Sequence, residues 1–150
     1  MMPKNEITIR DMEHGMVDAV AELERLCFSS PWSSDMIIEE LENSFARLFV
    51  AEMGGKIAGY CGVQLLAGEG YITNVAVHPD WRRLGIGRML VNRLVELAIE
   101  ETAEFLTLEV RKSNEAAIGL YQSMGFEEVG VRPGYYSKPI EDALLMTRRF

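Results

Sequence analysis

Cysteine and histidine are scarce in this sequence, and their scarcity argues against two common kinds of site. The chain has 150 residues but only two cysteines, Cys27 and Cys61, and two histidines, His14 and His78. Two cysteines are too few for a disulfide framework, and none of the four residues stands at metal-ligand spacing, so we expect no metal site. We expect both cysteines to be buried as small apolar side chains, Cys27 on a helix and Cys61 on a strand.

Long apolar runs and an excess of positive charge are also missing. No run approaches the roughly 18 apolar residues that a membrane span needs, and residues 1–6 lack the apolar core of a signal peptide. We therefore expect a cytoplasmic protein with no membrane partner. The net charge of −8 disfavours a nucleic-acid partner. It would suit a basic peptide substrate, although an acidic surface that aids solubility explains the same charge.

The rest of the composition is that of an ordinary globular protein, with 48% hydrophobic and 25% charged residues. We expect a single domain over residues 1–150. Alternating apolar residues predict strands over 7–10, 48–52, 57–64, 71–77, 105–110, 127–131 and 143–147. Helical spacing predicts helices over 16–27, from Ser33 or Ser34 to about 43, over 86–101, and from a cap at Asn114 to a left-handed Gly125. The order βααβββαβαββ favours an α/β fold, a sheet of about seven strands with helices on both faces.

A glycine-rich segment connects the strand over 71–77 to the long helix over 86–101. Its sequence is Arg82-Arg83-Leu84-Gly85-Ile86-Gly87-Arg88. Glycine lets the backbone turn tightly, and the first amides of a helix lie unpaired at the positive end of its dipole, so a pyrophosphate can bind there. The segment is not a P-loop, and it is not a dinucleotide fingerprint because Leu90 stands where a third glycine belongs. By itself the signal is weak, because many loops carry Gly-x-Gly and a plain strand–helix connection with basic residues stays possible.

Further motifs accompany the glycine loop. They are Cys27-Phe28, Pro31-Trp32-Ser33, Asn74-Val75-Ala76-Val77-His78-Pro79, Leu108-Glu109-Val110-Arg111, Ser113-Asn114, Ala117-Ile118-Gly119-Leu120-Tyr121, Gly125-Phe126, Tyr135-Tyr136 and Glu141-Asp142-Ala143. In this order they resemble the GNAT N-acetyltransferase superfamily over nearly the whole chain. The resemblance is to its RimI type, which acetylates the N-terminal alanine of a small-subunit ribosomal protein. Related archaeal N-terminal acetyltransferases share much of the pattern.

The resemblance implies a fold and a cosubstrate, acetyl-CoA. In the GNAT fold, the strands that end at Val77 and Val110 are parallel neighbours that splay apart, and the pantetheine arm of the cosubstrate enters the gap. The arm would pair with the main chain of Val75, Ala76 and Val77. The pyrophosphate would bind the loop of Arg82, Arg83, Leu84, Gly85, Ile86, Gly87 and Arg88, and Asn114 would contact the cosubstrate while also capping its helix.

The resemblance also assigns two catalytic roles. Glu109 would be the general base, directly or through a water, and Tyr121 the general acid that protonates the departing thiolate. Read without the family, Glu109 is an exposed strand glutamate paired with Arg111 or a lysine, and Tyr121 is a core aromatic. An amine and a thioester need no nucleophilic cysteine, so we expect direct attack by the amine, with main-chain amides near Val77 polarising the carbonyl.

The acceptor depends on other residues. Phe28, Trp32, Tyr135 and Tyr136 are expected in or beside loops that flank the amine in related enzymes, although satellite core packing explains them equally well. We expect transfer to the N-terminal α-amine of a protein, in particular an N-terminal alanine of a ribosomal protein, by a monomer. Two alternatives stay open: acetylation of a lysine or a small amine, and a non-catalytic coenzyme A sensor, against which the pair Glu109 and Tyr121 argues.

Overall fold

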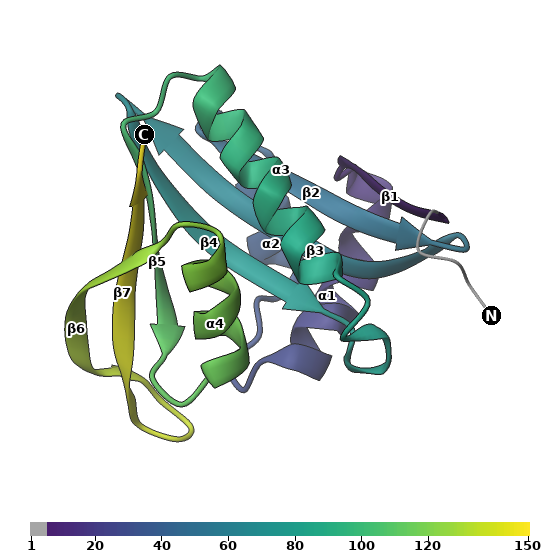
Figure 1. Cartoon of the computed structure of the whole chain (residues 1–150). Coiled ribbons are helices and arrows are strands. Elements are labelled where there is room, and N and C mark those ends of the chain that lie inside the picture. The colour runs from purple at the N-terminus through teal and green to yellow at the C-terminus, as the bar shows by residue number, and fades with distance from the viewer. Residues whose placement is uncertain (1–5) are drawn as a thin grey trace.

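A seven-stranded sheet forms the centre of the molecule, with the strand order β1-β2-β3-β4-β5-β7-β6 (Figure 1). The computed structural model describes residues 6–150, so residues 1–5, which carry most of the signal-peptide argument, lie outside it. The strands are β1 Ile7–Asp11, β2 Ala46–Met53, β3 Lys56–Leu66, β4 Glu69–Val77, β5 Phe105–Arg111, β6 Glu127–Tyr136 and β7 Glu141–Arg149. The helices are α1 Val17–Cys27, α2 Ser34–Leu41, α3 Ile86–Glu100 and α4 Glu115–Ser123, with short 3₁₀ turns at His14–Met16 and Pro79–Trp81.

Helices cover both faces of this sheet. α3 and α4 lie on one face, and α1 and α2 lie on the other (Figure 1). Neighbouring strands are antiparallel except β4 and β5, which are parallel and are connected through α3, because parallel strands need a crossover. The order of elements and the mixed α/β class predicted from the sequence are therefore confirmed.

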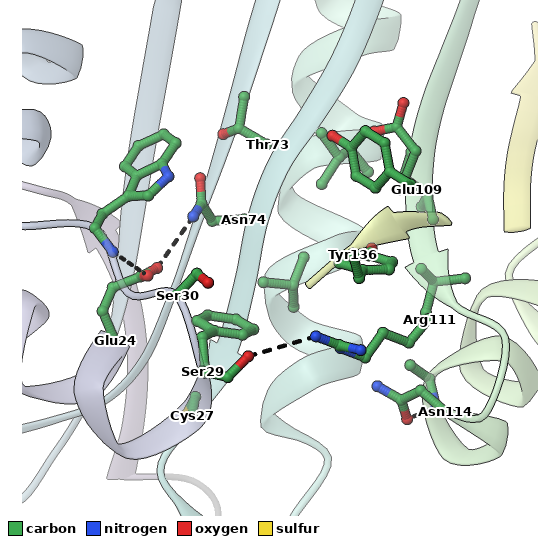
Figure 2. A pocket seen from close by; sticks show the side chains of 18 of the residues that line it. Glu24, Cys27, Ser29, Ser30, Thr73, Asn74, Glu109, Arg111, Asn114 and Tyr136 are labelled. Atoms are coloured by element: carbon green, nitrogen blue, oxygen red, sulfur yellow. Dashed lines mark hydrogen bonds between the residues drawn. The ribbon is translucent and has the colours of Figure 1, made fainter. Parts of the chain in front are cut away.

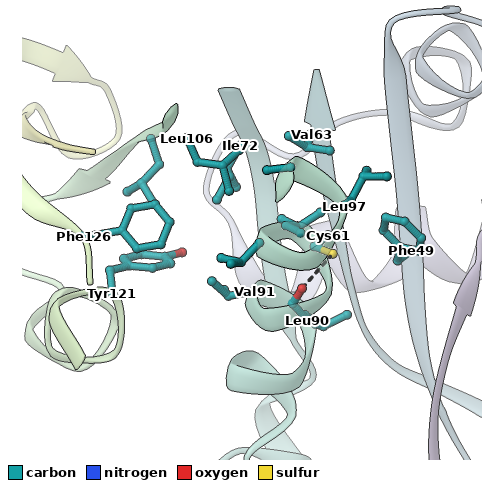
Figure 3. Packing of buried hydrophobic residues seen from close by; sticks show 14 of the residues in the cluster. Phe49, Cys61, Val63, Ile72, Leu90, Val91, Leu97, Leu106, Tyr121 and Phe126 are labelled. Atoms are coloured by element: carbon teal, nitrogen blue, oxygen red, sulfur yellow. Dashed lines mark hydrogen bonds between the residues drawn. The ribbon is translucent and has the colours of Figure 1, made fainter. Parts of the chain in front are cut away.

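Two apolar clusters fix the helices on the sheet. On the α3 side, Leu90, Val91 and Leu94 are fully buried, and the cluster continues to Tyr121 and Phe126 (Figure 3). The second cluster packs α1 and α2 against the opposite face, and its fully buried members include Val20, Ile37, Val50 and Tyr60. Each large apolar side chain contributes roughly 1.5–3 kcal/mol when it is buried, so these clusters hold β4 and α4 in fixed positions.

The parallel strands β4 and β5 pair only at one end. Within the described residues their register ends with Tyr71 opposite Thr107. Gly70 permits the close approach there, because a Cβ at Gly70 would lie 2.5 Å from Leu106 Cδ2. Directly beyond, Thr73 is a β-bulge that has no opposite residue on β3. A bulge bends its strand, and from this point β4 and β5 diverge (Figure 1), as the family resemblance implied.

The predicted helix ends are confirmed where they involve capping side chains or glycine. Ser33 caps α2, since its hydroxyl accepts a hydrogen bond of 3.2 Å from the Met36 amide. Asn114 caps α4 in the same way through the Ala117 amide, also at 3.2 Å. Gly125 follows α4 with φ of +92°, in the left-handed conformation that a C-terminal cap requires.

The end of β6 was predicted wrongly. The expected strand ended at residue 131, which would leave Tyr135 and Tyr136 in a loop, whereas β6 continues to Tyr136. Pro133 and Gly134 are strand breakers, but β6 is an edge strand, where proline is tolerated because no neighbour needs its missing N–H. The register with β7 shifts between Arg132 and Tyr136, so the breakers are absorbed as an irregularity.

Other expectations need smaller corrections. α2 ends at Leu41 instead of near residue 43. Cys61 is buried as expected, but Cys27 is only partly buried. Between residues 6 and 150, none of the helices has the length and apolar character needed to cross a bilayer.

Candidate active site

A cavity of about 530 Å³ lies between the diverging strands β4 and β5 (Figure 2). Residues 72–75 of β4 and 108–111 of β5 form two of its walls. α4 contributes side chains from a third side, and the segments 27–32 and 135–137 contribute residues from the other two. The cavity therefore lies at the carboxyl ends of two parallel strands, where open α/β sheets bind their ligands.

Eight of the 17 site residues predicted from the sequence converge on this cavity. Its lining includes Phe28, Trp32, Val75, Glu109, Asn114, Tyr121, Tyr135 and Tyr136. Ala76, Val77 and the glycine loop, residues 82–88, do not line it. They continue the chain from the end of β4, so the predicted phosphate site and the cavity are neighbours along the same strand.

The glycine loop has the geometry of an anion site. Gly85 is the N-cap of α3 with φ of +81°, and a Cβ there would meet no atom within 4 Å. Among the described residues, no side chain accepts from the first amides of α3 at this cap, so these amides stay available to a ligand. Arg82 Nε donates to Val77 O over 3.3 Å, which ties the loop to β4.

Glu109 projects from β5 with two side-chain partners. It alternates with the buried Leu108 and Val110, as predicted, and its own side chain is 7% exposed. The Tyr71 hydroxyl donates a hydrogen bond to Oε2. Arg132 Nε lies 3.2 Å from Oε1, and the Arg132 side chain is 55% exposed.

Without the family resemblance, the sequence predicted an exposed Glu109 paired with Arg111 or a lysine, and the contacts in the structure are different. A carboxylate offers about four lone-pair positions. Tyr71 and Arg132 occupy two of them, so Glu109 can still accept a hydrogen bond from a group in the cavity.

Tyr121 is both a core residue and part of the cavity wall. It is 7% exposed, and its ring meets Phe126 edge to face with centroids 5.8 Å apart. In Figure 3 its hydroxyl points away from Phe126. Burial raises the pKa of Tyr121 above its ordinary value. The phenol therefore stays protonated at neutral pH, and its hydroxyl can donate a hydrogen bond.

Aromatic side chains from two separate segments line the cavity, and the exposure of Phe28 (38%) and Tyr135 (49%) places both segments at its mouth. Phe28 and Trp32 come from the α1–α2 connection, and Trp32 also packs against the second core cluster. Tyr135 and Tyr136 come from β6, with their rings edge to face at 5.0 Å. Burial raises the pKa of Tyr136 to about 12, so its hydroxyl is a hydrogen-bond donor at neutral pH.

Glu24 is a cavity residue that the sequence analysis missed. It is 1% exposed and accepts hydrogen bonds from Tyr60 Oη, from the Trp32 amide at 2.9 Å and from Asn74 Nδ2 at 3.0 Å (Figure 2). Burial raises the pKa of Glu24, and these donors oppose that rise. A signal was present, because Glu24 follows Val20 by one helical turn on the apolar face of α1, where a carboxylate needs partners.

Comparison with known proteins agrees with this geometry. Residues 17–126 match the acetyltransferase (GNAT) family. The chain belongs to that family and is an N-acetyltransferase.

Individual relatives are more specific. A protein of Bacillus subtilis (strain 168), which carries the provisional name ribosomal protein bS18-alanine N-acetyltransferase, is 41% identical over 95% of both chains. The crystal structure of the ribosomal-protein-S18-alanine N-acetyltransferase from Escherichia coli superposes with a TM-score of 0.88 and 33% identity, over 95% of this chain and 93% of that one. The structure of a Thermoplasma acidophilum N-acetyltransferase in complex with coenzyme A shares the fold, with a TM-score of 0.81 and 14% identity, over 96% of this chain and 99% of that one.

Proposed function

We propose that this enzyme transfers an acetyl group from acetyl-CoA to the N-terminal α-amine of a protein, and that the acceptor is an N-terminal alanine of a ribosomal protein. One observation carries the proposal. The cavity between β4 and β5 holds Glu109 and Tyr121, in a chain whose near-full-length relatives are named for alanine N-acetylation.

The residues around the cavity fit acetyl-CoA as the donor. Beyond Tyr71, β4 has no pairing with β5 in the described part of the chain, which leaves the main chain of Val75, Ala76 and Val77 to receive an extended pantetheine arm. Gly85 offers uncapped helix amides and open space for a pyrophosphate. Asn114 lies at the start of α4 beside the cavity, within the same lining.

The chemistry assigned to the side chains is a direct transfer. The amine nitrogen forms a bond to the thioester carbonyl carbon, and the carbon–sulfur bond breaks. Glu109 accepts the proton that the amine loses, directly or through a water. Tyr121 donates its proton to the departing thiolate. An α-amine with a pKa of about 8 is largely protonated at neutral pH, which is why a base beside it is useful.

A panel of peptides with acetyl-CoA, read by mass spectrometry, tests this function. The panel holds peptides that differ only in the first residue, the alanine peptide with its N-terminus blocked and a lysine inside, and a small amine. We expect acetylation at the free N-terminal alanine, with little at the internal lysine. Acetylation confined to lysine or to the small amine would contradict the acceptor proposed, and coenzyme A binding without turnover would contradict catalysis.

A further inference from the structure

Arg111 forms contacts with both sides of the cavity mouth. It is the last residue of β5, and its guanidinium lies over the Tyr136 ring at 4.5 Å. It donates to Ser137 O at 3.0 Å and to Pro139 O at 3.1 Å, in the turn after β6. On the other side it donates to Ser29 Oγ at 3.4 Å (Figure 2). Ser29 belongs to the α1–α2 connection, 82 residues away in the sequence.

The two segments that Arg111 joins are the ones that carry the mouth aromatics. Ser29 stands between Phe28 and Trp32, and the turn follows Tyr135 and Tyr136. The α1–α2 connection packs with the helices on one face of the sheet, whereas the turn extends from the edge strand β6 at the far end of the sheet. A contact through Arg111 therefore relates two walls that the sheet itself does not hold at a fixed distance.

The guanidinium is itself held in place by a carboxylate. Arg111 donates to Glu141 Oε1 at 3.1 Å, and the other oxygen of Glu141 accepts from the Ser113 amide at 2.7 Å. The bonds from Ser113 and Arg111 hold the pKa of Glu141 below its usual value. A planar guanidinium can serve several acceptors at once in fixed directions, which an ammonium cannot do.

We propose that Arg111 is a positioning residue for the acceptor: it sets the spacing between the wall of Phe28 and Trp32 and the wall of Tyr135 and Tyr136. This inference rests on the proposed function, because it assigns these aromatics to the acceptor. Arg111 takes no part in the proton transfers. Its loss should weaken acceptor binding and leave the site of acetyl-CoA intact.

Steady-state kinetics test this role. In R111Q, we expect the KM for the alanine peptide to rise about tenfold, which is the size of one lost hydrogen bond to a charged group. The hydrogen bonds of the guanidinium reach neither Glu109 nor Asn114 nor the glycine loop. The KM for acetyl-CoA and kcat should therefore stay within about twofold. R111K should remain impaired, because one ammonium cannot bond to acceptors on both walls at once. Equal rises in both KM values, or full activity in R111K, would overturn the proposal.

Hydrogen exchange without any substrate tests the same inference independently of activity. R111Q should speed exchange at the Trp32 amide, which bonds to Glu24, and at the Gly134 amide, which bonds to Asp142. S29A, a milder change that removes only one contact of Arg111, should speed exchange at Trp32 alone. Faster exchange at Gly134 only, in both variants, would show that Arg111 merely stabilises its own turn.

R10Q is the control, since Arg10 likewise bridges acceptors from different segments, Glu13 and Glu52, but lies on β1, outside the lining of the cavity. R10Q should leave the exchange rates of both amides and both KM values unchanged. Faster exchange and a higher KM for the peptide in R10Q would contradict a specific role of Arg111. If the peptide panel fails while the exchange pattern is as expected, the acceptor assignment is wrong and the structural coupling through Arg111 still holds.

Discussion

At the scale of single residues, Glu109 is the group whose removal should change the chemistry most. In E109Q the amide cannot take a proton from the amine, so we expect turnover at neutral pH to fall by about 10²–10⁴, the usual contribution of a general base. The loss should shrink above pH 8, because an α-amine with a pKa of about 8 is then deprotonated without help. Rates with the alanine peptide between pH 6 and 10 measure both effects.

The control for Glu109 is E39Q, which removes the same charge from the exposed face of α2. E39Q should keep the rate and pH dependence of the parent enzyme. An E109Q profile that runs parallel to that of the parent, with the same deficit at every pH, would contradict a role as base and would favour a purely structural one beside Arg132.

A site residue could be identified from the sequence where its signal is local, and not where its role depends on residues distant in the chain. Glu109 follows from strand alternation together with its motif, and both are local in the chain. Its partners Tyr71 and Arg132 lie 38 positions before it and 23 after it, and only the pairing of β4, β5, β7 and β6 brings them together. Arg111 was predicted as part of a motif, but its contact with Ser29 is equally non-local.

At the scale of elements, the connection from β4 to α3 is the segment proposed to bind the pyrophosphate of the cosubstrate. In G85A, the left-handed φ of +81° should cost about 1–2 kcal/mol of stability, partly offset by the smaller entropy of the unfolded chain. We also expect a KM for acetyl-CoA raised about tenfold, equivalent to 1.4 kcal/mol of binding, because relief of the strain moves the first amides of α3. Thermal unfolding and initial rates measure the two effects.

G55A separates strain from function. Gly55 has φ of +78° and, like Gly85, open space around its Cβ position, but it lies in the turn between β2 and β3. The G55A variant should lose about as much stability as G85A and keep the KM of the parent enzyme for acetyl-CoA. A KM that rises equally in both variants would mean that stability alone limits the reaction, and an unchanged KM in G85A would remove the phosphate role from this loop.

The order of the elements was predictable because each one is specified locally, by a repeat of apolar residues and by caps such as Ser33 and Asn114. The end of β6 was not, because Pro133 and Gly134 break a strand unless it lies at an edge, and edge position is a property of the whole sheet. The same holds for the cavity itself. The cavity depends on the end of the β4–β5 pairing at Tyr71 and on the bulge at Thr73, and no local sequence pattern indicated either feature.

At the scale of the whole molecule, the sheet consists of two parts joined by a short parallel seam. β1 to β4 form one part, and β5, β7 and β6 form the other, with pairing between the parts limited to residues 69–71 and 105–107 within the described chain. A ligand in the gap would add contacts to both parts and would bind the folded state alone. At a concentration of 100 times Kd, such a ligand stabilises the fold by about 2.7 kcal/mol.

Coenzyme A at that concentration should therefore raise the Tm by roughly 5–10 °C for a chain of this size. Adenosine 3′,5′-bisphosphate is a fragment of coenzyme A that lacks pantetheine. At a concentration of 100 times its own Kd it raises the Tm by the same amount, so the two compounds are distinguished by which residues they protect. At matched Tm shifts, coenzyme A should slow amide exchange both in residues 82–88 and in residues 72–77, where β4 faces the gap, whereas the fragment should protect the loop alone. Equal protection of residues 72–77 by both compounds would mean that the seam tightens without pantetheine between the strands, and the gap would then have to serve the acceptor instead.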